Sequence, residues 1–213
     1  MDWVKVLLPW IGSLALAVAL CAWLLTPRPL SLPQRLFGAL LIVGLLTEIL
    51  MRLKGLFAFR LGFFSTIHNL LELVLVVQLV KAQLPQLRRW AHVLGGIGFL
   101  LFLIAVGRQE DLTLSVTQGS MVTGVVLSIL MVRALWERLE TKEGDLWGHP
   151  EFWIYLGYLL YFVTRVPIMG SVMYIWERYP ELSRSMYMMF QFVLVVRNVL
   201  FVVACRKYRP AHA

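Results

Sequence analysis

The chain alternates between long apolar segments and short polar ones, and this alternation predicts its architecture. Windows of about 19 residues, a length that crosses a bilayer as a helix, identify seven apolar segments. The segments are nearly continuous, which favours helices over the alternating strands of a membrane barrel. We therefore expect an all-α polytopic membrane protein, a seven-transmembrane-helix bundle that forms one domain over residues 1–213, with spans at 6–25, 36–53, 63–80, 90–106, 116–135, 152–169 and 186–205.

Proline and polar residues refine three of these segments. The fifth segment starts with polar residues such as Ser120 and Thr123, so it is the weakest of the seven spans. Pro150 suits the first turn of the sixth helix, and we expect this helix to continue past Pro167 toward Trp176 with a kink or break. The first segment is long for the core of a signal peptide, and no small-residue cleavage site follows it. We therefore interpret it as a span.

The composition agrees with membrane insertion and excludes several other classes of protein. Apolar residues make up 60% of the chain and charged residues 15%, with a mean hydropathy of +0.76, whereas soluble domains carry about 25% charged residues. The net charge of +8 comes from short basic clusters between the apolar segments, as the positive-inside rule produces. The expected partner is the lipid bilayer. A soluble enzyme domain, a nucleic-acid-binding protein and a disulfide-stapled module are excluded.

The distribution of basic residues predicts the orientation of the chain. If the N-terminus is outside, the inner loops and tail carry eleven Lys and Arg residues and the outer side carries seven. The inner count includes Arg206, Lys207 and Arg209, which follow the last segment directly. Basic residues concentrate on the cytoplasmic side of membrane proteins. We therefore expect an outside N-terminus, a cytoplasmic C-terminus and a location in a bacterial-type plasma (inner) membrane.

Polar residues inside the spans are the candidate functional groups, because ionisable side chains in hydrocarbon are costly unless they are paired or hydrated. The candidates come from four spans. They are Glu48 in the second span; His68, Asn69 and Glu72 on one helix face of the third; Tyr158, Tyr161 and Arg165 on one helix face of the sixth; and Gln191, Arg197 and Asn198 in the seventh. We expect these residues to form a ligand-binding polar pocket, open to the outer side, for a small molecule or a lipid headgroup. The alternative is hydrogen bonding between helices that only holds the bundle together.

The same residues leave two chemical alternatives open. His68 and Glu72 lie one helical turn apart and could be two metal ligands, with Glu48 as a third. Ser65 and His68 share a helix face, as a nucleophile and its base would. Neither pattern is specific, so we expect no metal and no cofactor, and the question of enzymatic activity stays open.

Arg197 lies near the middle of the last span and needs a partner. Its guanidinium stays protonated in proteins, and a side chain at this depth does not readily reach either headgroup region. A carboxylate partner would compensate the buried charge of Arg197 at the lowest free-energy cost. We therefore predict that Arg197 pairs with Glu72 or Glu48, an interaction that would join the last span to the second or third.

Three short motifs accompany this layout: Pro150-x-Phe152-Trp153, Arg165 before Pro167, and Arg197-Asn198. With them, the chain resembles small bacterial seven-helix integral membrane proteins and the seven-helix membrane input region of some sensor histidine kinases. No kinase or other output domain follows Ala213, so the resemblance implies a sensing or accessory subunit that signals through a separate cytoplasmic or membrane partner. The polar stretch from Glu137 to His149 is expected to be a solvated helix extension, with a docking surface as the alternative.

These observations rank three functions. The leading hypothesis is a receptor-like or accessory signalling membrane protein that binds a small or lipidic ligand in a polar pocket of the outer half. The alternative is a membrane-embedded enzyme acting on lipid, with His68 and Glu72 as acid–base or metal groups, and a small transporter comes third. A receptor needs one open face and a partner surface, whereas a transporter needs access from both faces.

Overall fold

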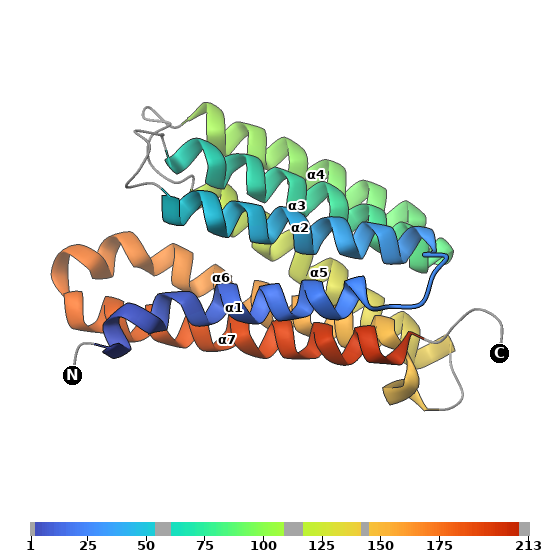
Figure 1. Cartoon of the computed structure of the whole chain (residues 1–213). Coiled ribbons are helices and arrows are strands. Elements are labelled where there is room, and N and C mark those ends of the chain that lie inside the picture. The colour runs from blue at the N-terminus through green and yellow to red at the C-terminus, as the bar shows by residue number, and fades with distance from the viewer. Residues whose placement is uncertain (1–2, 54–60, 109–116, 142–144, 209–213) are drawn as a thin grey trace.

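The computed structural model of the chain describes residues 3–53, 61–108, 117–141 and 145–208, and within these ranges all regular structure is helical (Figure 1). The long helices are α1 (Trp3–Leu24), α2 (Leu32–Arg52), α3 (Leu61–Gln83), α4 (Arg88–Gly107), α5 (Thr117–Thr141), α6 (Pro150–Arg178) and α7 (Pro180–Lys207). Two short 3₁₀ helices, η2 (Pro85–Leu87) and η3 (Leu146–Gly148), precede α4 and α6. The predicted all-α architecture is confirmed.

Six segments of the described helices are long and apolar enough to cross a membrane: Leu32–Met51, Phe64–Gln83, Pro85–Gly107, Gln118–Glu140, Pro150–Ser171 and Met188–Lys207. The protein is therefore a multi-pass membrane protein. The first predicted span falls in α1, of whose side chains the structure describes those from Trp10 onward, and this described part, Trp10–Leu24, is apolar.

The helix ends follow from the residues at them. The backbone N–H of Ser31 donates to Oε1 of Gln34 at 2.7 Å, which satisfies one of the donors left open at the start of α2. Prolines stand in the first turns of α2, α6 and α7, where no intrahelical bond is lost. The prediction that the sixth helix passes Pro167 is confirmed, because α6 continues to Arg178. No break in helical structure occurs at this proline.

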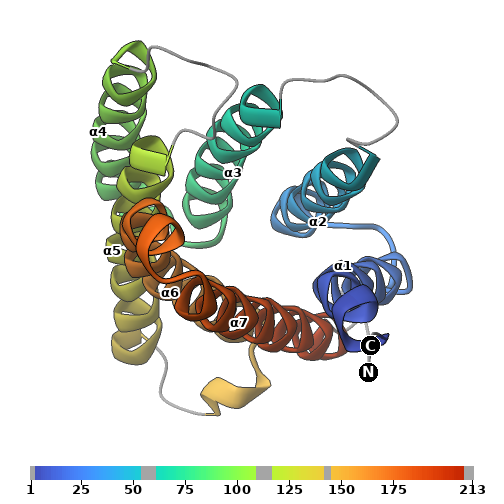
Figure 2. The ribbon, with the colours of Figure 1, turned by 90° about the vertical axis from the view of Figure 1, so that its left-hand side faces the viewer.

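Six of the described helices form a closed ring, and α4 lies outside it (Figure 2). Around the ring, α1 packs on α2, α2 on α3, α3 on α5, α5 on α6, α6 on α7 and α7 on α1. α4 packs mainly against α3 and α5. This arrangement leaves α2 and α3 opposite α6 and α7, so the side chains of these four helices meet across the centre of the ring.

The interior of the ring differs between its two ends. At the end that holds the connection from α1 to α2, large apolar side chains fill the centre, including the fully buried Phe37, Leu41 and Phe201. The rings of Phe37 and Phe201 meet edge to face with their centroids 5.2 Å apart, a favourable aromatic geometry. Toward the end that holds the N-terminus, the interior becomes polar. The core therefore occupies one half of the bundle and leaves the other half for the site.

Alanine substitutions at two glycines provide a test of this packing. A Cβ at Gly157 of α6 would lie 2.9 Å from a ring carbon of Phe201, whereas a Cβ at Gly96 of α4 would meet nothing within 4 Å. We expect Gly157→Ala to lower the free energy of unfolding by about 1–3 kcal/mol, the usual cost of overpacking. Gly96→Ala, the matched control, should leave stability unchanged or raise it by up to about 1 kcal/mol through helix propensity. Reversible unfolding of the purified protein in detergent measures both, and equal effects of the two substitutions would contradict the packing of α6 on α7.

Candidate functional site

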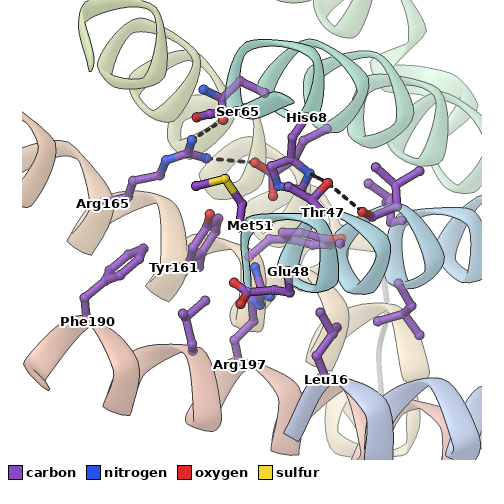
Figure 3. A pocket seen from close by; sticks show the side chains of 18 of the residues that line it. Leu16, Thr47, Glu48, Met51, Ser65, His68, Tyr161, Arg165, Phe190 and Arg197 are labelled. Carbon is purple, nitrogen blue, oxygen red and sulfur yellow. Dashed lines mark hydrogen bonds and ion pairs between the residues drawn. The ribbon is translucent and has the colours of Figure 1, made fainter. Parts of the chain in front are cut away.

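A cavity of about 220 Å³ lies inside the ring, on the side of the core that faces the N-terminal end of the bundle (Figure 3). Its walls come from the second half of α2, the first half of α3 and the middle parts of α6 and α7, with Leu16 added from α1. Polar side chains line one part of it and apolar ones the rest. The cavity thus has the mixed character of a site for a small molecule.

Eight of the ten candidate residues line this cavity: Glu48, His68, Asn69, Glu72, Tyr158, Tyr161, Arg165 and Arg197. The structure therefore brings together residues that lie up to 149 positions apart in the chain, Glu48 and Arg197 being the extremes. Gln191 and Asn198 are not among the lining residues. Both lie against α1 near Gly12, whose carbonyl accepts a hydrogen bond from Nδ2 of Asn198 at 3.4 Å, so they join α1 to α7 instead.

Arg165 of α6 is the centre of a buried polar network. Its Nη1 donates to Oε2 of Glu72 at 2.8 Å, and its Nη2 donates to Oδ1 of Asn69 and to Oγ of Ser120. The side chains of Arg165 and Glu72 are each only 6% exposed. One guanidinium thus connects α3, α5 and α6, and its charge is compensated by a carboxylate in direct contact.

Ser120 belongs to this network but was not among the predicted site residues. It is 2% exposed and lies in the first turn of α5, in the polar stretch that makes this span the weakest of the seven. Thr123, one helical turn further, is also buried, and its hydroxyl donates to backbone carbonyls of α5. The polarity of this stretch was therefore the signal that a partner for a buried arginine lies there.

The predicted carboxylate partner of Arg197 is wrong. Among the described residues, no carboxylate lies within 4 Å of its guanidinium, and Glu72 pairs with Arg165 instead. Arg197 stacks on aromatic rings, with its guanidinium carbon 4.3 Å from the centroid of Tyr161 and 5.5 Å from that of Phe201. Both arginines and Glu72 face the same cavity. The pattern of residues along the chain does not show which arginine pairs with Glu72, because the packing of α3 against α5 and α6 determines this pairing.

Arg197 has almost no hydrogen bonds in the described part of the chain. Its Nη2 donates to Oδ1 of the adjacent Asn198 at 3.5 Å, a long contact, and its Nε has no partner. The residue is only 8% exposed. A guanidinium carries five N–H donors, so most of this donor capacity is unused.

Glu48 and His68 are held from neighbouring helices. Oγ of Ser13 in α1 donates to Oε2 of Glu48 at 3.0 Å. The hydroxyl of Thr47 lies 2.8 Å from the carbonyl of Val43 and 3.1 Å from Nδ1 of His68. Because this hydroxyl has one proton, which it donates to the carbonyl, we assign Nδ1–H of His68 as the donor to Thr47. The assignment leaves Nε2 of His68 as an acceptor.

The described residues contain no group of three His, Cys, Asp or Glu side chains arranged to hold a metal ion. Within the proposed His68–Glu72 pair, Oε2 of Glu72 accepts from Arg165 and Nδ1 of His68 contacts Thr47. Both cysteines, Cys21 and Cys205, are free thiols. The chemistry that this cavity offers is therefore hydrogen bonding and charge, on groups that neighbouring helices hold in place.

A second polar cluster lies at the opposite end of the bundle and was not predicted. Nη2 of Arg138 in α5 donates to the backbone carbonyl of Gln83 at 3.2 Å and lies 3.9 Å from Oε1 of Glu151 in α6. Tyr155, which is fully buried, lies close enough to Arg138 and Glu151 to interact with them electrostatically. The predicted helix extension is present as far as Thr141, and residues 142–144 of that polar stretch lie outside the described residues.

The ion pair predicts a strong coupling between two residues. Glu72→Met or Arg165→Met alone should lower the free energy of unfolding by about 3–5 kcal/mol, because each strands a buried opposite charge. The double substitution should recover more than half of that loss, since no buried charge then remains unpaired. Unfolding of the three variants in detergent measures the cycle. Additive losses in the double variant would show that the pair does not form.

The contrast between the two arginines gives a second prediction. Arg197→Met should leave the free energy of unfolding within about 1 kcal/mol of the wild type, because no carboxylate is stranded and methionine keeps much of the packing. Arg165→Met is the matched comparison, with the loss given above. A loss of about 3 kcal/mol or more for Arg197→Met would mean that Arg197 has a structural anionic partner.

Comparison with known proteins assigns no family to this geometry. No protein-family model matches the chain, and neither a curated protein nor a solved structure matches it. A fold alone would not define an activity, since one fold hosts many functions. The function is therefore argued from the cavity and the residues that line it.

Proposed function

We propose that this protein is a receptor-like or accessory signalling membrane protein that binds a small or lipidic ligand in the cavity of the helix ring. The observation that carries the proposal is a polar cavity with a closed end. Charged side chains from four helices line the cavity, three of them buried and Glu48 half-buried, while Phe37, Leu41 and Phe201 fill the ring at its closed end. Such a cavity suits a ligand that enters and leaves by the same side.

The closed end also favours binding over transport. A transporter must expose its site alternately to both faces, and its site lies near the middle of the membrane between mobile elements. Here the space between the cavity and the far end of the ring is occupied by fully buried aromatic and aliphatic side chains. Moving a substrate through this half would require the core itself to separate.

We further propose seven spans, an outside N-terminus and a cytoplasmic C-terminus in a bacterial-type plasma membrane. The support is the excess of basic residues on the inner side, eleven against seven, together with the apolar described part of α1, Trp10–Leu24, beside the six apolar spans. In this orientation the cavity lies in the outer half of the bilayer, and the Arg138–Glu151 cluster lies at the cytoplasmic end.

A separate signalling partner completes the proposal, as the resemblance to sensor-kinase input regions implies. The support is the cytoplasmic end of α5 and α6, where Leu139 and Trp147 are exposed beside charged residues of the helix extension. Aromatic side chains are enriched at contact surfaces between proteins, and the rim of such surfaces is polar. The partner would sense a change in the relative position of these two helices.

Orientation is tested by cysteine labelling in intact cells. In a background with Cys21→Ala and Cys205→Ala, we expect Tyr179→Cys, between α6 and α7, to react with a membrane-impermeant maleimide added outside. Pro27→Cys, between α1 and α2, should react only after the membrane is opened. The reverse pattern would invert the topology, and reaction of both positions from outside would contradict the number of spans.

Access to the cavity is tested in the same background. Met51→Cys, at the lining position nearest the end of α2, should react with a small impermeant thiosulfonate added outside and not with the same reagent inside inverted vesicles. Met189→Cys, an exposed position on α7, is the control that should stay unreactive because it faces lipid. Reaction of Met51→Cys from both faces would favour a transporter over the proposed receptor.

A further inference from the structure

Arg197 and Asn69 carry buried N–H groups without partners, and both line the cavity. Nε of Arg197 and Nδ2 of Asn69 make no hydrogen bond in the described part of the chain, and the residues are 8% and 1% exposed. Oδ1 of Asn69 accepts from Arg165, which fixes the amide so that its NH₂ group is the one left over. Both unpartnered groups are donors, and a buried donor without an acceptor is costly. The cavity therefore contains two buried N–H groups that no acceptor of the described residues reaches.

The two arginines that line the cavity are compensated to different degrees. Arg165 is compensated by Glu72 at 2.8 Å, while Glu48 is held by Ser13 on the α1 side at 3.0 Å. Besides its long contact with Asn198, Arg197 meets the faces of Tyr161 and Phe201, and such contacts compensate a buried cation far less than a carboxylate does. A guanidinium with unused donors is well suited to bind a carboxylate or phosphate with two parallel hydrogen bonds.

From these observations we infer that the cavity binds an anion with an apolar body, a carboxylate or a phosphate monoester, whose anionic group pairs with Arg197. This inference rests on the proposed function, since it names the chemistry of the ligand in the same cavity. The apolar body follows from Leu16, Leu40 and Leu194, which form part of the wall. The size follows from the volume of about 220 Å³, which holds one small molecule or one headgroup but not a two-chain phospholipid.

Figure 3 shows how the site would be used. The side chain of Arg197 extends from α7 into the space between Tyr161 and Glu48, and Arg165 approaches from α6 at the other side of Tyr161. The two arginines therefore have separate tasks, although both are buried. Arg165 holds the helices through its three partners, and Arg197 presents its donors to the occupant of the cavity.

The test uses the purified full chain in phosphatidylcholine nanodiscs with hexanoate as the probe. We expect hexanoate to raise the unfolding temperature in a saturable way, and its uncharged isostere hexanamide to bind at least tenfold more weakly. Arg197→Gln should weaken hexanoate binding at least tenfold. Arg133→Gln, which removes an arginine of α5 that pairs with Glu137 away from the cavity, is the matched control and should bind like the wild type. Equal binding of acid and amide, or of wild type and Arg197→Gln, would overturn the inference.

A second arm separates a free anion from a lipid headgroup. In nanodiscs that contain phosphatidylglycerol and no hexanoate, a stabilisation of the wild type that Arg197→Gln abolishes would identify the lipid as the source of the anion. Stabilisation by hexanoate or inorganic phosphate alone would identify a free anion.

If Arg197→Gln does not fold, Arg197→Lys keeps the charge without the planar guanidinium group, and it should bind hexanoate between threefold and tenfold more weakly than the wild type. Wild-type affinity in Arg197→Lys would overturn pairing through parallel hydrogen bonds.

The cavity itself is tested with Met51→Trp, which fills it, and Met189→Trp as the exposed control. Loss of hexanoate binding only in Met51→Trp supports the inference. If hexanoate and hexanamide bind with equal affinity and Met51→Trp abolishes both, the cavity binds a ligand as proposed, but the inference that the ligand is an anion is overturned. Hexanoate binding that Met51→Trp does not change would place the site elsewhere and overturn both.

Discussion

The cost of a buried charge is the constraint on which this bundle depends. Arg165 and Glu72 lie deep in the helix ring with 6% of each side chain exposed, and each would be a buried charge without a counterion if the other were absent. Their contact fixes α6 relative to α3, and the hydroxyl of Ser120 brings α5 to the same point. Three helices therefore have one relative arrangement in which all of these polar groups are satisfied.

The cavity follows from the same constraint. Apolar side chains on the inner faces of α2, α3, α6 and α7 meet and exclude space at the end near Phe37 and Phe201. At the other end the facing side chains are polar and hold one another from the walls, so the centre is not filled. The apolar half stabilises the ring through close packing, and the polar half provides a cavity lined by hydrogen-bonding and charged groups.

Much of the fold was predictable, because the length and spacing of apolar segments are local properties of the sequence. That polar residues gather inside the bundle was predictable, because the cost of polar groups in hydrocarbon sends Glu48, His68 and Glu72 inward whichever helices face them. The pairing was not predictable. Which arginine reaches Glu72 depends on how α3 packs against α5 and α6, and Ser120 becomes a partner only through that contact. Gln191 and Asn198 face α1 for a similar reason, since ring closure sets their orientation.

The positions of the polar contacts on α5 and α6 have a mechanical consequence. Ser120 and Arg165 meet at one end of this helix pair, and Arg138 and Glu151 approach each other at the opposite end. The two positions on α5 are separated by 18 residues in the sequence, or about 27 Å along a helix axis. Closely packed helices with polar contacts at both ends resist sliding and bending. A displacement of Arg165 would therefore move α5 and α6 as a unit and shift the contact of Arg138 with Glu151 at the opposite end of the pair.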